Sequence, residues 1–113
     1  MIIKLNDFTN EAASKTKGIV LRELIENNIE NIEGVDFSGI SRFASPFFNN
    51  SFSALALIYG FEKIGSIELI GINEVGCETY ETSMENAKLL SQNEQYMDAI
   101  NDIVNSVPKK AGD

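Results

Sequence analysis

The chain has 113 residues, of which 43% are hydrophobic, and its formal net charge is −8. This length suits one ordinary domain with one core. The acidic balance disfavours nucleic acid as a partner, because an acidic surface repels phosphate backbones. The sequence has no histidine and only one cysteine, which removes the commonest general base and leaves a zinc site little to build on. We therefore expect a chain that is not an enzyme and that holds no metal or cofactor.

Membrane insertion and export are not expected from the sequence. No apolar run approaches the roughly 18 residues that indicate a membrane span. The first residues, Met1 to Leu5, form too short an apolar stretch for a signal peptide. These features predict a cytoplasmic protein without a membrane partner.

The first third of the chain predicts one strand and one helix. Ile2, Ile3 and Leu5 indicate a short strand. Apolar residues at helical spacing then predict a helix over about residues 17 to 31, with Ser14 or Thr16 before it as candidate caps. The side of this helix that faces water is expected to carry Arg22, Glu23, Glu26 and Asn27.

The middle of the chain predicts a strand at residues 35–37 and a helix that begins at Ser45-Pro46. Serine is a favoured N-cap, and proline suits the first helical position because it has no N–H to leave unpaired. Gly60 is expected to end this helix. Its predicted apolar face consists of Phe48, Phe52, Leu55, Ala56 and Tyr59.

The last third predicts a nearly apolar strand over residues 66–72 and helices over about 79–90 and 94–107. The predicted order is β-α-β-α-β-α-α. Strands that alternate with helices indicate crossover connections and hence a parallel sheet. The fold class is therefore α/β, with a small, mostly parallel or mixed sheet and about four helices. We expect one domain over residues 1–108 and a polar tail over 109–113.

Two motifs in the middle of the chain resemble a known family. Val35-Asp36-Phe37-Ser38-Gly39-Ile40, followed by Phe43-Ala44-Ser45-Pro46-Phe47-Phe48, resembles a STAS domain. This family includes bacterial anti-sigma-factor antagonists, and the similarity is greatest to a STAS-like group of unassigned function. The resemblance implies an α/β scaffold that binds an ATP-binding kinase-like or anti-sigma-like protein. It also implies that Ser45 is the candidate phosphoacceptor, although Ala44 stands where the family has an acidic residue.

Ser45 has two interpretations. As an N-cap, its side chain stabilises the helix by about 1 kcal/mol. As a phosphoacceptor, it would place a phosphate at the positive end of the helix dipole and add negative charge to an interface. Arg42 lies three residues earlier; it is either a solvated surface residue or a cation near that phosphate.

The other candidate partner-binding residues surround Ser45 in sequence. Asp36 either accepts N–H bonds from the turn after its strand, or shapes an acidic docking surface, or accepts a phosphoryl group. Phe47 lies off the apolar stripe and is the expected exposed contact. Asn49, Asn50 and Ser53 are expected to flank it on the polar side of the same helix, and Ser38 is a further candidate for partner binding.

Two further functions stay open on the sequence alone. Open α/β sheets bind ligands beyond the carboxyl ends of their strands, and here those ends carry Ser38, Ser41 and Asn73. The domain could therefore bind a nucleotide or another small molecule. Alternatively, it could be a structural module that forms a homodimer.

Overall fold

The computed structural model of the chain describes residues 1–92. Its sheet has three strands in the order β1-β2-β3, and both neighbouring pairs are parallel. The strands are β1 (Ile2–Lys4), β2 (Gly34–Asp36) and β3 (Glu68–Ile70). The prediction of a small parallel sheet with helices is confirmed. The helix expected at 94–107 and the tail at 109–113 lie outside the described residues.

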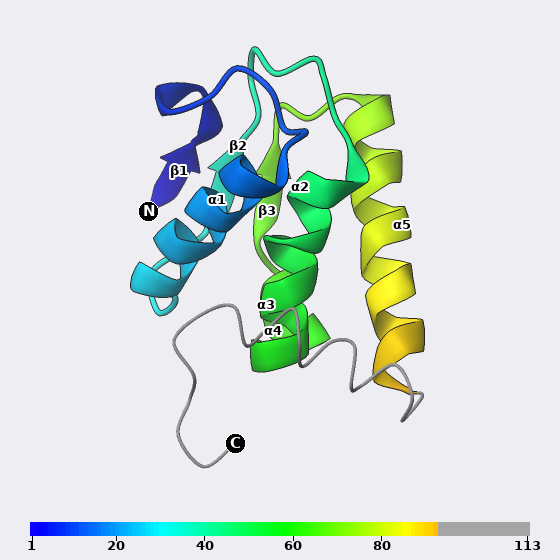
Figure 1. Cartoon of the computed structure of the whole chain (residues 1–113). Helices are drawn as coiled ribbons and strands as arrows, with labels where there is room; N and C mark the ends of the chain where they lie inside the picture. The colour runs from blue at the N-terminus through cyan, green and yellow to red at the C-terminus, as the bar shows by residue number, and fades with distance from the viewer. Residues whose placement is uncertain (93–113) are drawn as a thin grey trace.

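One face of this sheet carries the core. Ile3 pairs in register with Val35, and Val35 pairs with Leu69, so these three side chains share a face. Ile3 and Val35 are buried, whereas Ile2, on the opposite face, is 49% exposed. In Figure 1, α1 and α2 pass in front of the strands, and α5 stands beside α2 and α3. The helices therefore lie against the face that Ile3 and Val35 present.

The first helix, α1 (Lys15–Asn27), begins where Ser14 accepts a hydrogen bond from the backbone N–H of Lys17. Of the two candidate caps, Ser14 is the one confirmed. The expectation that Arg22 faces water is wrong, because its side chain is only 2% exposed. The helix packs against both α2 and α3, so its buried stripe is wider than that of a helix with one neighbour.

The helix predicted from Ser45-Pro46 to Gly60 is two short helices in the structure, and a third short helix follows the stop at Gly60. They are α2 (Ser45–Asn49), α3 (Phe52–Tyr59) and α4 (Phe61–Gly65). At the first break, the Ser51 hydroxyl donates to the carbonyl of Phe47, and this local bond competes with continued helix geometry. At the second, Gly60 has a φ of 104°, which glycine adopts without steric cost. The stop at Gly60 is thus confirmed, whereas the break at Ser51 was not predicted.

The last described helix, α5 (Glu74–Ser91), begins five residues before the predicted start near residue 79. The Asn73 side chain accepts a hydrogen bond from the backbone N–H of Gly76 at 2.8 Å and caps it. A short 3-10 turn, η1 (Leu5–Asp7), follows β1. The order over residues 1–92 is therefore β1-η1-α1-β2-α2-α3-α4-β3-α5.

Aromatic side chains fill the core between β2 and α5. The ring of Phe48 lies 5.8 Å from that of Tyr80 and 6.1 Å from those of Phe37 and Phe52. Phe37, Phe48 and Phe52 are fully buried, and such rings are the largest contributors of apolar area to a core. This aromatic cluster (Phe37, Phe43, Phe48, Phe52 and Tyr80) packs around the connection between β2 and α2.

Candidate functional site

The candidate site is the segment that runs from the end of β2 through a loop into α2. Its loop is held at both ends by backbone hydrogen bonds. Phe37 donates to the carbonyl of Ile70 at 2.7 Å, which ties the start of the loop to β3. Near its end, Ala12 donates to the carbonyl of Arg42 at 2.9 Å, and Ala44 donates to the carbonyl of Ala12 at 3.0 Å. These bonds set the position from which α2 begins.

Asp36 shapes the first turn of this loop. Its Oδ1 accepts a hydrogen bond of 2.9 Å from the backbone N–H of Ser38. Bonds from the hydroxyl and the N–H of Ser38 hold the pKa of the Asp36 carboxyl below its usual value, and the charge of Lys4 lowers it further. The expectation that Asp36 accepts an N–H bond from the following turn is confirmed. A role for its carboxylate in docking or phosphoryl transfer stays a prediction.

The ends of β2 and β3 meet at a close backbone contact. Gly71 has a φ of 67°, and a Cβ on it would lie 2.5 Å from the Ser38 hydroxyl oxygen. Asn73, the next polar residue along this edge, uses its side-chain oxygen to cap α5. Ser38 and Asn73, which the sequence suggested for ligand binding, are thus engaged within the domain. Nucleotide binding at this edge stays a prediction.

Ser45 is the first residue of α2, and its side chain is exposed. The prediction that it caps the helix is wrong. Ala44, with φ −150° and ψ 152°, is the N-cap, and no side chain caps this helix. Ser45 already has helical geometry, so Pro46 is the second helical residue. Among residues 1–92, no hydrogen bond engages the Ser45 hydroxyl, which leaves it open to solvent.

Phe47 is not the exposed contact that the sequence suggested. It is 0% exposed, and its ring packs edge-on against Phe48 at 5.2 Å. A Cβ on Gly18 of α1 would lie 2.5 Å from the Phe47 carbonyl oxygen, so α1 comes directly against this residue. The two-sided contact, with α1 and with the aromatic cluster, explains why the residue beside the apolar stripe is buried too.

Ser53 also faces inward, contrary to the expectation that it lies on the polar side. It is 4% exposed, and its hydroxyl lies 2.6 Å from that of Ser83 on α5. The Ser83 hydroxyl donates to Oδ1 of Asn49 at 2.6 Å. This chain of hydrogen bonds satisfies polar groups between α2, α3 and α5, as buried polar groups require. The sequence carries no sign of it, because residues 53 and 83 are separated by α4 and β3.

The remaining candidates lie at the surface. Arg42 and Asn49 are exposed, and Ser38 is exposed at the end of β2. Asn50 is half-buried, and its Nδ2 donates to the carbonyl of Pro46 at 2.8 Å, which closes the end of α2. The structure therefore keeps the side chains of Ser38, Arg42, Ser45 and Asn49 in contact with solvent.

The match to known families covers this same part of the chain. Residues 17–76 match the STAS-like domain of unknown function (DUF4325). The match spans α1 to the first turn of α5 and more than half of the chain's 113 residues. The chain belongs to this STAS-like family. A search of curated proteins and a search of solved structures each gave no significant match.

A cavity of the STAS-like domain lies away from this segment. It measures about 270 Å³ and lies between α4 and α5, where it is lined by Phe61, Gly65, Tyr80, Glu81, Met84, Glu85 and Lys88. The Lys88 Nζ lies 5.7 Å from the centre of the Phe61 ring, and this contact joins the two walls. None of the residues suggested for ligand binding at the strand ends contributes to it.

Metal binding and membrane insertion would each need particular groups of side chains. Among residues 1–92, no group of three Cys, Asp or Glu side chains is placed to hold a metal ion. Within the same residues, no helix is long and apolar enough to cross a bilayer. Cys77 is a free, partly exposed thiol on α5. A homodimeric role and the cytoplasmic location stay predictions.

Proposed function

We propose that this STAS-like domain is a non-enzymatic regulatory module that binds a partner protein through a docking face. The docking face is defined as the exposed side chains Ser38, Arg42, Ser45 and Asn49. The partner is an ATP-binding protein of the kinase-like or anti-sigma-like type, as the STAS resemblance implies.

The observation that carries the proposal is the exposure of the Ser45 side chain. Its hydroxyl is exposed at the start of α2 and does not serve as the cap of that helix. The residues before and after it are fixed, because Ala44 bonds to Ala12 and Phe47 is fully buried. The Ser45 hydroxyl is thus exposed and, among residues 1–92, without a hydrogen-bond partner, so a modifying enzyme could reach it.

Phosphorylation of Ser45 would alter the docking face without disturbing the core. A phosphate adds up to about two negative charges at neutral pH, and the positive end of a helix dipole favours an anion at its first turn. Because the side chain already faces solvent, the new charges would not be buried. They would change the electrostatic match to the partner, so we propose that the modification redirects partner binding.

The test is ATP-dependent capture from native lysate followed by peptide mapping. The wild-type domain, Ser45→Glu and the control Ser66→Glu serve as baits. Ser66 is also exposed, but it lies after α4, where its hydroxyl donates to the carbonyl of Lys63. We expect a protein that wild type and Ser66→Glu retain equally and that Ser45→Glu loses, together with a phosphate on Ser45 after incubation with ATP. Equal capture by all three baits, with Ser45 unmodified, would contradict the proposal.

A further inference from the structure

A buried arginine on α1 has no role in the docking face. Arg22 is 2% exposed, and its Nε is buried without a hydrogen-bond partner. The ion pair found within residues 1–92 joins the N-terminal amine to Glu33 and does not involve Arg22. No described carboxylate therefore neutralises Arg22. A guanidinium carries five N–H donors and keeps its charge. A buried charge with an unpaired donor and no described counter-charge is costly, so the environment of Arg22 favours binding of a counter-ion.

The neighbours of Arg22 along α1 locate its side chain. Gly18, Arg22 and Glu26 are each four residues apart and therefore lie on one line of the helix. Gly18 touches the backbone of Phe47 in α2. Glu26 accepts a hydrogen bond of 3.3 Å from the hydroxyl of Tyr59 at the end of α3. Arg22 therefore lies between these two contacts, opposite the junction where α2 ends and α3 begins.

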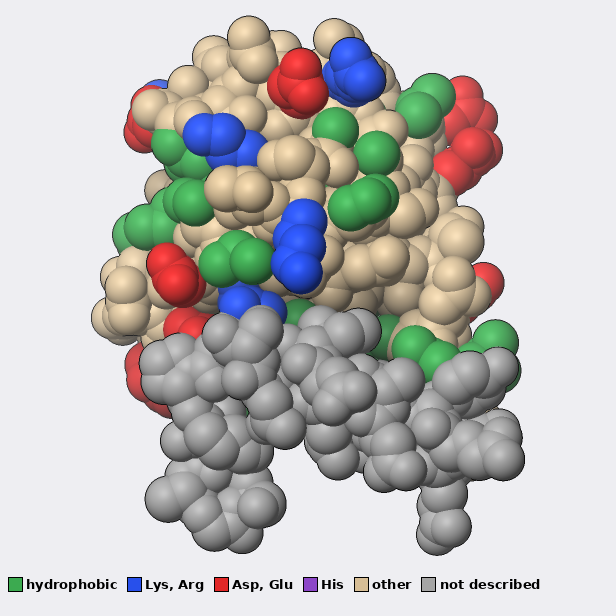
Figure 2. Space-filling view, in the orientation of Figure 1, with side chains coloured by type: hydrophobic (Ala, Val, Ile, Leu, Met, Phe, Trp, Pro, Cys, Tyr) green, Lys and Arg blue, Asp and Glu red, His purple; other side chains and the backbone are tan. Residues whose placement is uncertain are grey.

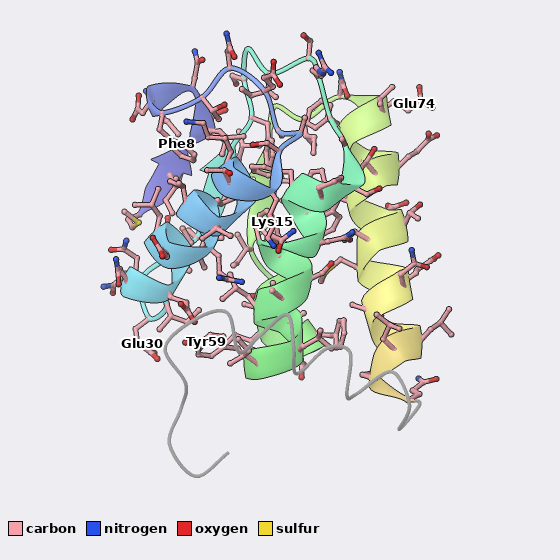
Figure 3. The ribbon with its side chains drawn as sticks, in the orientation of Figure 1. Phe8, Lys15, Glu30, Tyr59 and Glu74 are labelled. Atoms are coloured by element: carbon pink, nitrogen blue, oxygen red, sulfur yellow. The ribbon has the colours of Figure 1, made fainter. Side chains whose placement is uncertain are left out.

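This seam between α1 and the α2–α3 junction is favourable for an anion. Lys15 lies seven residues before Arg22, two helical turns along the same side of α1, and Figure 3 shows it beside α2. In Figure 2, basic side chains lie in the middle of this face, whereas most acidic ones lie toward its margins. The helix α3 also begins at this junction without a side-chain cap, and helix starts attract negative charge.

We propose that Arg22 anchors a binding site for an oxyanion, a carboxylate or a phosphate, in the seam between α1 and the α2–α3 junction. The planar guanidinium matches the paired oxygens of either group, which a lysine does not. The bound group would satisfy Nε and neutralise the buried charge. The site lies on α1 and is independent of the proposed docking face, so either proposal can fail without the other.

The chain offers a sharp test, because Arg22 and Arg42 are its only arginines. A proton–nitrogen correlation spectrum of the arginine Nε–H groups then contains two signals. The exposed Arg42 is the internal control. Inorganic phosphate and acetate are added in turn at constant ionic strength, with chloride as the balancing salt. We expect the Arg22 signal to shift and saturate, whereas that of Arg42 shifts weakly and without saturation.

A variant distinguishes the two sources of the oxyanion. This variant makes the acidic side chains of residues 93–113 neutral by combining Glu94→Gln, Asp98→Asn, Asp102→Asn and Asp113→Asn. If one of those carboxylates is the ligand, the Arg22 signal of the wild type ignores added phosphate, differs in the variant, and responds to phosphate there. If the ligand is a free anion, both proteins respond alike.

A second measurement separates binding from a purely structural role. Phosphate should raise the melting temperature of whichever protein shows the Arg22 shift, because a ligand that binds only the folded state stabilises it. Arg22→Lys keeps the charge but should lose this rise. Several outcomes would overturn the proposal: an Arg22 signal that exchanges with water as fast as that of Arg42, a signal unmoved by anions in both proteins, or an equal rise in Arg22→Lys.

Discussion

The segment from β2 to α3 has two sides with opposite properties. Its inner side, defined as Phe37, Phe47, Phe48 and Phe52, is fully buried. Its outer side is the proposed docking face of Ser38, Arg42, Ser45 and Asn49, which is exposed. Several ring contacts and backbone contacts hold each residue of the inner side in place, whereas the outer side makes few contacts within the domain. Mutations on the inner side should therefore change stability, and those on the outer side should change binding.

The largest expected effect comes from removing the ring at the centre of the inner side. Phe48 lies within 6.3 Å, measured between ring centres, of Phe37, Phe43, Phe47, Phe52 and Tyr80. We expect Phe48→Ala to lower the free energy of unfolding by about 3–5 kcal/mol, because a buried ring leaves a cavity behind. Chemical denaturation measures it. A loss below about 0.5 kcal/mol, the range of surface changes, would contradict the burial of this side.

A second inner-side change tests the contact between α1 and α2. Alanine for glycine in the middle of a helix normally stabilises it by about 1 kcal/mol. At Gly18 the added Cβ would lie 2.5 Å from the Phe47 carbonyl oxygen, so we expect Gly18→Ala to destabilise by about 1–3 kcal/mol instead.

Gly65 is the matched control for Gly18. It lies in α4, and a Cβ on it meets nothing within 4 Å. Gly65→Ala should therefore leave the free energy of unfolding unchanged or raise it. Equal effects of the two substitutions in thermal denaturation would mean that α1 does not approach α2 as closely as described.

A moderate effect is expected where the outer side meets α5. Ser83→Ala removes the donor to Asn49 and the partner of Ser53. Leaving buried polar groups unpaired costs about 1–3 kcal/mol. Ser91→Ala, at the exposed end of α5, should change stability by less than about 0.5 kcal/mol. If both variants unfold at the same denaturant concentration, the buried network contributes nothing.

A smaller effect concerns pH and Asp36. The Ser38 bonds lower the pKa of its carboxyl in the folded state below the ordinary value of 3.8. The group therefore contributes stability above pH 3.8, and this contribution is lost as the pH falls through the folded-state pKa. We expect Asp36→Asn to lose less stability than wild type on acidification across that range. Parallel stability–pH curves for the two proteins would contradict it.

The sequence predicts the boundaries of the segment better than the side chains that the segment buries. The positions of β2, the Ser45-Pro46 start and the Gly60 stop follow from local preferences for strand, helix start and turn. The buried Phe47, Ser53 and Arg22 do not, because each is buried by a helix that is distant in sequence.

The N-caps of the helices show the same limit of prediction from the sequence, here for single residues. Ser14 is a cap, as predicted. Ser45 is not, because Ala44 takes the extended geometry that a cap requires, and the backbone hydrogen bonds that Ala12 makes with Arg42 and Ala44 hold the chain there. A pattern of residue types cannot show such a contact. The one-residue shift leaves the Ser45 hydroxyl without a hydrogen-bond partner among residues 1–92, and the proposed docking face depends on this exposed hydroxyl.

The smallest effect on stability should occur at Ser45 itself. Ser45→Ala and Ser45→Glu should each change the free energy of unfolding by less than about 0.5 kcal/mol, since the exposed hydroxyl is not the cap of α2. Thermal denaturation measures this. A loss of about 1 kcal/mol in Ser45→Ala would show instead that the side chain acts as a cap.

The most direct test of the docking face is the affinity of the captured partner for the wild type, Ser45→Glu and Ser66→Glu, measured by calorimetry. The account predicts that Ser45→Glu binds at least about tenfold more weakly, a difference of roughly 1.4 kcal/mol, whereas Ser66→Glu binds as the wild type does. Equal dissociation constants for all three proteins, at equal stability, would contradict a docking face centred on Ser45.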